Sequence, residues 1–383
     1  MSKPSARLHQ LDGLRALAVT VVVLHHAGAA SVATTLTGKG YPIAGRLLST
    51  GTASGVELFF VLSGIVLLRP YVRRGRPLAL VEYLKRRAQR LWPPFIAAWL
   101  VSGLVIHLTT SYPSWWTRDE GNPLPIFSVS TWLAQLGIAY LGTDRFNWAW
   151  WSLTVEMIFY VAVPPIVLAF ARVRPTRTHL VACWIVAVLV ALAAQQVPEQ
   201  LLPPQAWPIP SFAVYGSCFA AGVLLAAYDF PPTWGPVMML VGGVYAILAC
   251  AWPALNVHVG WGLLYFGLVT VALDSSSRVA RLFSQWPFVW LGERSYSLFL
   301  VHFAVFTSVC LAVSHVTTGK GPVYFALTRL IELPLALLAS MVIFDRIERR
   351  FAHGLVSGEA FWPTLKQPAS AEPSAAVAPP LAS

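Results

Sequence analysis

The feature that most constrains this chain is a series of long apolar segments that recurs along almost its whole length. The segments lie at about residues 14–30, 52–69, 92–109, 150–170, 180–194, 211–227, 235–252, 257–273, 295–316 and 322–345. Charged residues make up only 11% of the 383 residues, less than half of the roughly 25% that is usual in soluble domains. Most segments approach the roughly 20 apolar residues that a helix needs to cross a bilayer. The sequence therefore predicts an all-α polytopic membrane protein with about ten transmembrane helices.

The basic residues predict how these helices are oriented. If the N-terminus is cytoplasmic, 21 Lys and Arg residues lie on the cytoplasmic side and 5 lie on the opposite side. Positive charge gathers on the cytoplasmic side of membrane proteins, and an even number of helices then places both termini in the cytoplasm. The net charge of +11 is thus explained by contact with lipid headgroups and phosphate-bearing ligands, and nucleic acid is not an expected partner.

Three regions follow from this pattern. Residues 1–10 form a polar cytoplasmic segment, residues 11–353 form the transmembrane domain, and residues 354–383 form a cytoplasmic tail. The tail becomes rich in Ala, Pro and Ser, so we expect disorder towards its end. The outer loop 110–149 is rich in Trp and Pro, which predicts an aromatic belt at the headgroups or a cover over a cavity. The four cysteines lie inside apolar segments, and we expect neither a disulfide nor a metal site.

The first apolar segment carries ionisable side chains near both of its ends. Asp12 and Arg15 stand near its start, and His25 and His26 stand near its end. The separation of Arg15 and His26 returns to within about 20° of one helix face and spans about 16 Å along the axis. Ionisable groups at the centre of a membrane helix cost about 2.5–3.5 kcal/mol, so they persist mainly where they line a cavity or do chemistry. We expect Arg15 and His26 to face one polar cavity; the alternative is that the histidines bond to water and headgroups.

The second apolar segment begins with a carboxylate. Glu57 lies in the stretch 55–64, which also contains Ser63 and Gly64. A lone carboxylate in a membrane helix is a candidate functional residue, and Arg15 is its expected partner. The alternative is an ion pair that only orients two helices. Ser63 and Gly64 would allow close helix approach or a local break, and packing alone is a sufficient reason for them.

A cluster of arginines precedes the third apolar segment. Arg86 and Arg90 are four residues apart and share a helix face, Arg87 is adjacent, and Trp92 follows within one turn. Several guanidinium groups beside an aromatic ring suit a ligand with several phosphates and a planar base. The alternative is ordinary positive charge that meets anionic lipid on the cytoplasmic side.

The fourth apolar segment opens with a polar face. Trp151 begins it, Ser152 and Glu156 are four residues apart, and Tyr160 follows one turn later. A carboxylate within a membrane helix needs a partner, so Glu156 is expected to line a cavity. There it could orient an imidazole, bind an acceptor hydroxyl or pair with an arginine.

The ninth apolar segment contains three polar residues, Ser295, Tyr296 and His302. His302 is either a cavity residue or the donor or acceptor of a helix–helix hydrogen bond. The six histidines not yet named are scattered, and we assign them no role. The sequence contains no Gly-rich phosphate loop, no metal-ligand spacing and no Gly-x-Ser-x-Gly motif.

Together these stretches resemble the membrane acyltransferase-3 family, a group of integral membrane O-acyltransferases. The resemblance runs from about residue 9 to residue 353, and its most specific blocks are the first and the fourth. The matching blocks are Leu11 to Arg15 with His26, Gly55 to Gly64, Arg86-Arg87 with Arg90 and Pro93, Trp151 to Leu153 with Glu156 and Phe159-Tyr160, and Ser295 to Ser297 with His302. The sequence departs from the family where Glu57 replaces the more usual Asp and where Arg350 replaces Pro.

The resemblance implies a function and a set of roles. It implies an inner-membrane enzyme that moves an acyl group, most simply acetyl, from acyl-CoA to a hydroxyl of a carbohydrate or glycolipid, without a tightly bound cofactor. It also implies that His26 is essential and that Arg86, Arg87 and Arg90 bind the acyl-CoA. Our own hypothesis is that His26 acts as the general base and that Arg15 and Glu156 are also catalytic. The residues expected to line the cavity or position substrates are Asp12, His25, Glu57, Ser63, Trp151, Ser152, Tyr160, Ser295, Tyr296 and His302.

Two other functions fit the composition. A transporter or flippase for a glycan or a lipid-linked intermediate would also have many helices, charges within the membrane and aromatic loops. A membrane scaffold for polysaccharide assembly would need no role for His26. Cleavage of an acetyl-CoA thioester separates the enzyme from both alternatives.

Overall fold

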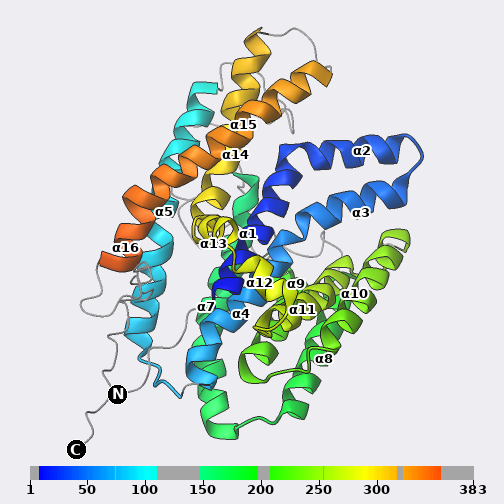
Figure 1. Ribbon diagram of the computed structural model, residues 1–383, viewed down its shortest axis with the longest axis vertical. Helices are drawn as coiled ribbons and strands as arrows, with labels where there is room; N and C mark the ends of the chain where they lie inside the picture. The colour runs from blue at the N-terminus through cyan, green and yellow to red at the C-terminus, as the bar shows by residue number, and fades with distance from the viewer. Residues whose placement is uncertain are drawn as a thin grey trace, which may run out of the picture.

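The computed structural model describes residues 8–73, 75–109, 147–196, 208–252, 254–316 and 322–354, and this part of the chain is helical throughout (Figure 1). The first half contains α1 (His9–Leu24), α2 (Ala30–Gly38), α3 (Pro42–Ala53), α4 (Gly55–Val72), α5 (Leu80–Thr109), α7 (Trp151–Val173) and α8 (Arg177–Ala194). The second half contains α9 (Pro208–Ala227), α10 (Trp234–Ala251), α11 (Val257–Leu273), α12 (Arg278–Phe283), α13 (Trp286–Glu293), α14 (Ser295–Val316), α15 (Pro322–Ile343) and α16 (Arg349–Gly354).

Every apolar segment predicted from the sequence is helical in the structure. Six stretches are long and apolar enough to cross a membrane: His9–Gly38, Pro42–Val72, Trp151–Val173, Arg177–Ala194, Trp234–Ala251 and Ala326–Phe351. Shorter apolar helices lie at Ser211–Ala227, Val257–Leu273 and Ser295–Cys310. The prediction of an all-helical polytopic membrane protein is confirmed, whereas ten crossings and two cytoplasmic termini stay predictions.

The outward faces of several helices are apolar. Leu189 on α8, Leu240 on α10 and Leu330 on α15 are 59%, 68% and 73% exposed. Exposed apolar surface of this extent would be a liability in water, and it is what a helix presents to lipid. The buried core lies where α1, α4, α7, α9, α11 and α14 meet, and this is where the polar residues of interest gather.

Three glycines lie where helices approach so closely that a larger residue would not fit. A Cβ atom on Gly13 of α1 would collide with the backbone of Phe283, and one on Gly292 of α13 would collide with the backbone of Asp12. Asp12 is therefore buried at the crossing of α1 and α13, away from the candidate site described below. Gly64 of α4 approaches α9 in the same manner, with its Cβ position 2.8 Å from the Cα atom of a second glycine. Small residues at helix crossings are a common means of close packing in membranes, and here they fix the positions of α1 and α4.

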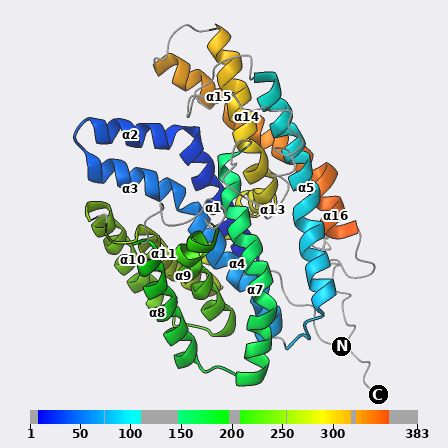
Figure 2. The same cartoon turned by 180° about the vertical axis from the view of Figure 1, so that it is seen from behind.

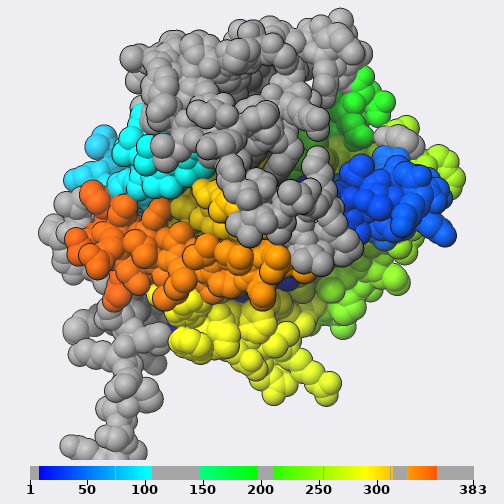
Figure 3. All heavy atoms as spheres, turned by 90° about the horizontal axis from the view of Figure 1, so that it is seen from above, coloured from blue at the N-terminus to red at the C-terminus, as the bar shows by residue number. Residues whose placement is uncertain are grey.

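The chain changes direction at the end of α1. The chain makes a π-helical turn at His25–Ala29, in which Gly28 has a φ of 121° that favours glycine. It then forms the α2–α3 hairpin, which extends sideways from the bundle (Figures 1 and 3). Viewed from behind, α5 lies beside α16 and α7 lies beside α4 (Figure 2). The predictions for most of the loop 110–149 and for the tail fall outside the described residues.

Candidate active site

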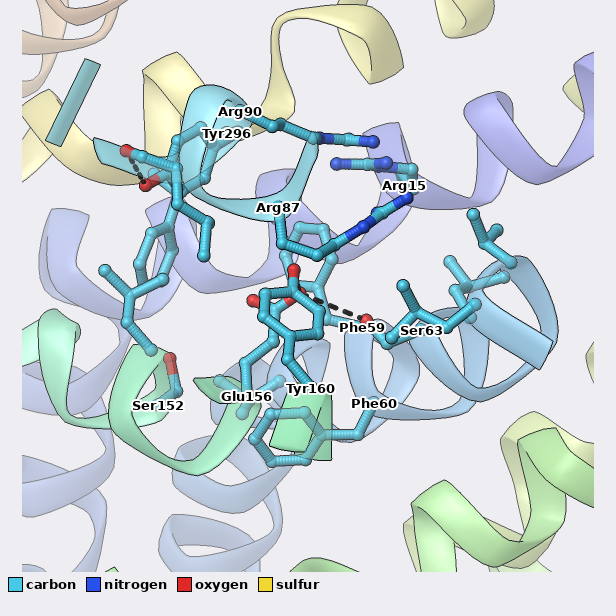
Figure 4. A pocket seen from close by; sticks show the side chains of 17 residues that line it. Arg15, Phe59, Phe60, Ser63, Arg87, Arg90, Ser152, Glu156, Tyr160 and Tyr296 are labelled. Atoms are coloured by element: carbon cyan, nitrogen blue, oxygen red, sulfur yellow. Dashed lines mark hydrogen bonds between the residues drawn. The ribbon is translucent and has the colours of Figure 1, made fainter. Parts of the chain in front are cut away.

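A cavity lies between α1, α4, α5, α7 and α14 (Figure 4). Its free space of about 70 Å³ is room for several water molecules or a small acyl group. The structure brings together eight residues that the sequence analysis selected from five separate segments. They are Arg15, Ser63, Arg87, Arg90, Ser152, Glu156, Tyr160 and Tyr296.

Three guanidinium groups converge at one side of this cavity. The side chains of Arg15 from α1 and of Arg87 and Arg90 from α5 point towards one another (Figure 4). Arg15 Nε donates to Ser295 Oγ at 3.3 Å, and the Arg87 guanidinium lies 6.0 Å from the centroid of the Tyr160 ring. Like charges repel most strongly where water is scarce, so such a cluster is stabilised by an anion that binds between its members.

Arg86 does not belong to this cluster, which corrects the prediction that it lies with Arg87 and Arg90. Its Nε donates to Glu82 Oε1 at 2.8 Å, and its side chain is 41% exposed. This hydrogen bond lowers the pKa of Glu82. Neighbouring residues on a helix diverge by about 100°, so Arg86 turns to the surface where Arg87 turns inward. Arg15, from another helix, completes the group of three.

The carboxylate of Glu156 lies among hydroxyl groups. Its Oε1 accepts from Tyr160 Oη at 2.6 Å and from Ser63 Oγ at 3.3 Å, so α4 and α7 are joined at the cavity wall. Glu156 thus lines the cavity, and its hydrogen-bond partners are a phenol and a serine, neither of which was among the three alternatives considered from the sequence. Tyr296, also in the wall, donates its hydroxyl to the backbone oxygen of Leu91 at 3.0 Å.

His26 and His302 form a pair outside the cavity lining. His302 Nε2 lies 3.3 Å from His26 Nδ1, and the ring centroids are 5.1 Å apart. His302 is fully buried, and His26 is partly buried in the π-helical turn. The partners of the ring nitrogens define the tautomers of both rings. His302 Nδ1 donates to Leu298 O at 3.1 Å, and His26 Nδ1 lies 3.0 Å from Val22 O.

Only one proton arrangement satisfies these contacts when both rings are neutral. His302 carries its proton on Nδ1, so its Nε2 is an acceptor. His26 carries its proton on Nδ1, which is shared between Val22 O and His302 Nε2. The lone pair of His26 is therefore on Nε2, the nitrogen that faces away from these partners. General bases often have this arrangement, in which one ring nitrogen donates to a second group and the other carries the lone pair.

Arg15 and His26 do not line one common cavity, contrary to the expectation from their spacing. Arg15 lines the cavity, whereas His26 pairs with His302 in the π-helical turn that follows α1. Phe299 lies between the two sites: it lines the cavity, and its ring centroid is 6.0 Å from that of His302. The α1–α14 interface thus has Arg15 and Ser295 at one end and the histidine pair at the other.

His25 and Trp151 lie beside these sites and not in the cavity wall. His25 Nδ1 lies 3.0 Å from Thr52 Oγ1, and its ring centroid is 5.2 Å from that of His26. Trp151 packs against Tyr215, with 5.2 Å between the ring centroids.

Glu57 pairs with a histidine, and the prediction that Arg15 is its partner is wrong. Glu57 is 2% exposed, and its Oε1 lies 2.6 Å from Nδ1 of His258. The sequence analysis assigned no role to His258, although it stands in the first turn of the apolar segment 257–273. An ionisable residue inside a membrane helix was the signal used for the other candidates, and it applied equally to His258.

The described residues contain no group of three or more His, Cys, Asp or Glu side chains arranged to hold a metal ion. The cysteine thiols Cys183, Cys218, Cys250 and Cys310 are not joined in disulfides.

Comparison with known proteins identifies the family. The sequence pattern of the acyltransferase-3 family, described as an acyltransferase domain, matches residues 8–344. The chain belongs to this family. The O-acetyltransferase OatA of Staphylococcus aureus strain NCTC 8325 / PS 47 is 25% identical over 394 aligned residues, which cover 93% of this chain and 59% of OatA. An O-acetyltransferase candidate of S. aureus strain COL is 23% identical, over 89% of this chain and 56% of its own length.

This acyltransferase chain thus spans less than two thirds of the length of these relatives. No solved structure matches this chain significantly.

Proposed function

We propose that this protein is a membrane O-acetyltransferase that moves an acetyl group from acetyl-CoA to a hydroxyl of a carbohydrate or glycoconjugate, such as a surface or exported polysaccharide. The observation that carries the proposal is the α1–α14 interface, with converging guanidinium groups at one end and an oriented imidazole at the other. The family and the names of the relatives support the reaction class.

The arginine end of the interface suits the donor. Arg87 and Arg90 would hold phosphates of acetyl-CoA, because guanidinium groups make paired hydrogen bonds to phosphate oxygens. Arg15, positioned by Ser295, would hold a further phosphate of the donor. Glu156, held by Tyr160 and Ser63, would limit the positive charge of the cavity and position the donor.

The histidine end of the interface suits the transfer step. The acceptor hydroxyl gives its proton to His26 Nε2 as its oxygen attacks the thioester carbonyl carbon. The C–S bond then breaks, and the CoA thiolate takes the proton from His26. His302 would stabilise the imidazolium by accepting from its Nδ1, and a base placed this way contributes about 10²- to 10⁴-fold to the rate. Phe299 must turn aside for the thioester to reach His26.

The orientation of the reaction follows from the basic residues. With the N-terminus in the cytoplasm, Arg15, Arg87 and Arg90 lie towards the side that holds acetyl-CoA. His26, at the other end of α1, lies towards the opposite side. We propose that the protein lies in the inner membrane of a bacterium. The donor would enter from the arginine end of the α1–α14 interface, and the acceptor would enter from the histidine end.

The test is cleavage of the thioester by purified protein. Acetyl-CoA is added in detergent with envelope glycans of the source organism as acceptor, and released CoA and acetylated product are measured. We expect both to appear with the natural sequence and to be lost with His26→Ala, at unchanged thermal stability. Absence of CoA release from the natural protein would reject the enzyme in favour of a transporter. An active His26→Ala variant beside an inactive His25→Ala variant would move the base to His25.

A further inference from the structure

A second set of polar side chains lies outside the cavity and outside the histidine pair. Glu57 of α4, His258 of α11 and Tyr215 of α9 form a chain in which the imidazole stands in the middle. His258 Nδ1 is 2.6 Å from Glu57 Oε1, and His258 Nε2 is 3.4 Å from Tyr215 Oη. Three helices from distant parts of the sequence thus contribute to one cluster.

Burial of Glu57 and hydrogen bonds of Asn256 fix the position of the His258 ring. The side chain of Glu57 is 3% exposed, so its charge or proton is shielded from water. The backbone of His258 is fixed because Asn256 caps α11 and accepts from the His258 amide at 2.9 Å. Asn256 is itself fully buried and donates to Ala191 O of α8. A buried carboxylate that receives Nδ1–H leaves the lone pair of the imidazole on Nε2.

That nitrogen lies beside a cluster of aromatic rings. The His258 side chain is 30% exposed, and the 3.4 Å contact with Tyr215 is long enough to be displaced by a better donor. Tyr215 packs against the His258 ring, Trp151 and Phe60, with centroids 4.5, 5.2 and 5.4 Å away. Flat rings around one or two fixed polar atoms are usual in sites that bind small polar molecules with partly apolar faces.

The cluster adjoins both parts of the proposed active site. Thr52, near the end of α3, contacts His25, and Glu57, in the first turn of α4, contacts His258. The junction of α3 and α4 therefore connects the turn after α1 with the start of α11. Phe60, one turn after Glu57, lines the arginine cavity and packs on Tyr215. A molecule bound at His258 would therefore lie near the end of the bundle where His26 presents its base.

We propose that Glu57, His258 and Tyr215 form the acceptor-binding site of this enzyme, and that the acceptor is a polyhydroxylated molecule such as a sugar unit. One hydroxyl donates to His258 Nε2, the faces of Tyr215 and Trp151 contact the carbon-bound hydrogens, and another hydroxyl of the same molecule reaches His26. The inference rests on the proposed transfer of acetyl groups and adds where the acceptor binds.

The decisive variant is His258→Asn. The Asn side-chain NH₂ replaces Nδ1–H and keeps the hydrogen bond to Glu57, whereas nothing replaces Nε2. Initial rates are measured with acetyl-CoA as donor and soluble envelope glycans of the source organism as acceptor, each titrated separately. His258→Ala and Tyr215→Phe are measured alongside, and His179→Asn, at the exposed start of α8, is the matched control.

We expect His258→Asn to raise the KM for the acceptor about ten-fold, with the KM for acetyl-CoA and the melting temperature unchanged. We expect His258→Ala to raise the KM for the acceptor by a similar factor. Tyr215→Phe should have a smaller effect of the same kind. A His258→Asn variant with natural acceptor KM beside an impaired or unstable His258→Ala variant would show that the cluster only joins α4 to α11, and the inference would be overturned. If the natural protein releases no CoA at all, the proposed function itself fails, which is a different result.

Discussion

The tautomer of His26 depends on His302, and this dependence predicts the effect of changing His302 alone. The variants His302→Asn and His302→Gln separate its two nitrogens. Asn can still donate to Leu298 O in the place of Nδ1–H but is too short to reach His26. Gln can place its side-chain oxygen near the position of Nε2 and accept from His26 Nδ1. Only the second variant should keep His26 oriented.

The size of the effect follows from the bond that is lost. A hydrogen bond to a charged group contributes about 1.5–3 kcal/mol, and His26 is charged only after it has taken the proton of the acceptor. At about 1.4 kcal/mol per factor of ten, His302→Asn should lower kcat/KM by about 10- to 100-fold. His302→Gln should recover most of this loss. The KM for acetyl-CoA should not change, because His302 does not line the arginine cavity.

The assay is CoA release from acetyl-CoA as a function of acceptor concentration and pH, with melting temperatures measured on the same preparations. Equal activity of His302→Asn and the natural protein would refute the reasoning. So would a His302→Gln variant as slow as His302→Asn, because the loss would then follow from packing and not from the hydrogen bond.

Three further predictions concern the surroundings of the site. Arg87→Ala should raise the KM for acetyl-CoA about ten-fold or more, whereas Arg86→Ala should change it less than about two-fold, as steady-state kinetics would show. Gly222→Ala should destabilise the protein by about 1–3 kcal/mol, seen as a lower melting temperature in detergent, because its new methyl group meets the α4 backbone. Arg73 lowers the pKa of Asp229, so its contribution to stability is present above the unfolded pKa of about 3.8 and is lost as the pH falls through the lower folded value. Melting curves of Asp229→Asn should lack this part of the acid dependence.

Many residues of the cavity could be predicted because they are ionisable or polar side chains inside apolar segments. A guanidinium or carboxylate in an apolar helix has few stable surroundings, so Arg15 and Glu156 could be selected without knowledge of the fold. Hydropathy likewise predicted which segments are helices, since the bilayer leaves the backbone little choice. The α2–α3 hairpin was not predicted, because helices were located by long apolar segments and most of the hairpin lies between two of these, at 14–30 and 52–69.

The choice of partners could not be predicted, because one sequence contains no information about which helices are neighbours. Glu57 and His258 are 201 residues apart, and Arg15 was an equally reasonable partner by charge alone. The same is true of the contact between His26 and His302, which lie 276 residues apart. Arg86 was misplaced for a different reason, because a run of adjacent basic residues does not reveal which of them faces the bundle.

The separation of the arginines from the imidazole along α1 has a consequence for donor choice. Eleven residues of helix set the two ends about 16 Å apart. A compact donor such as acetyl phosphate could occupy the guanidinium groups, but its carbonyl would stop well short of His26. Only a carrier whose anionic head and reactive carbonyl are joined by a long flexible arm, as in pantetheine thioesters, can satisfy both ends at once. The interface would then select its donor by the distance between the anionic head and the reactive carbonyl.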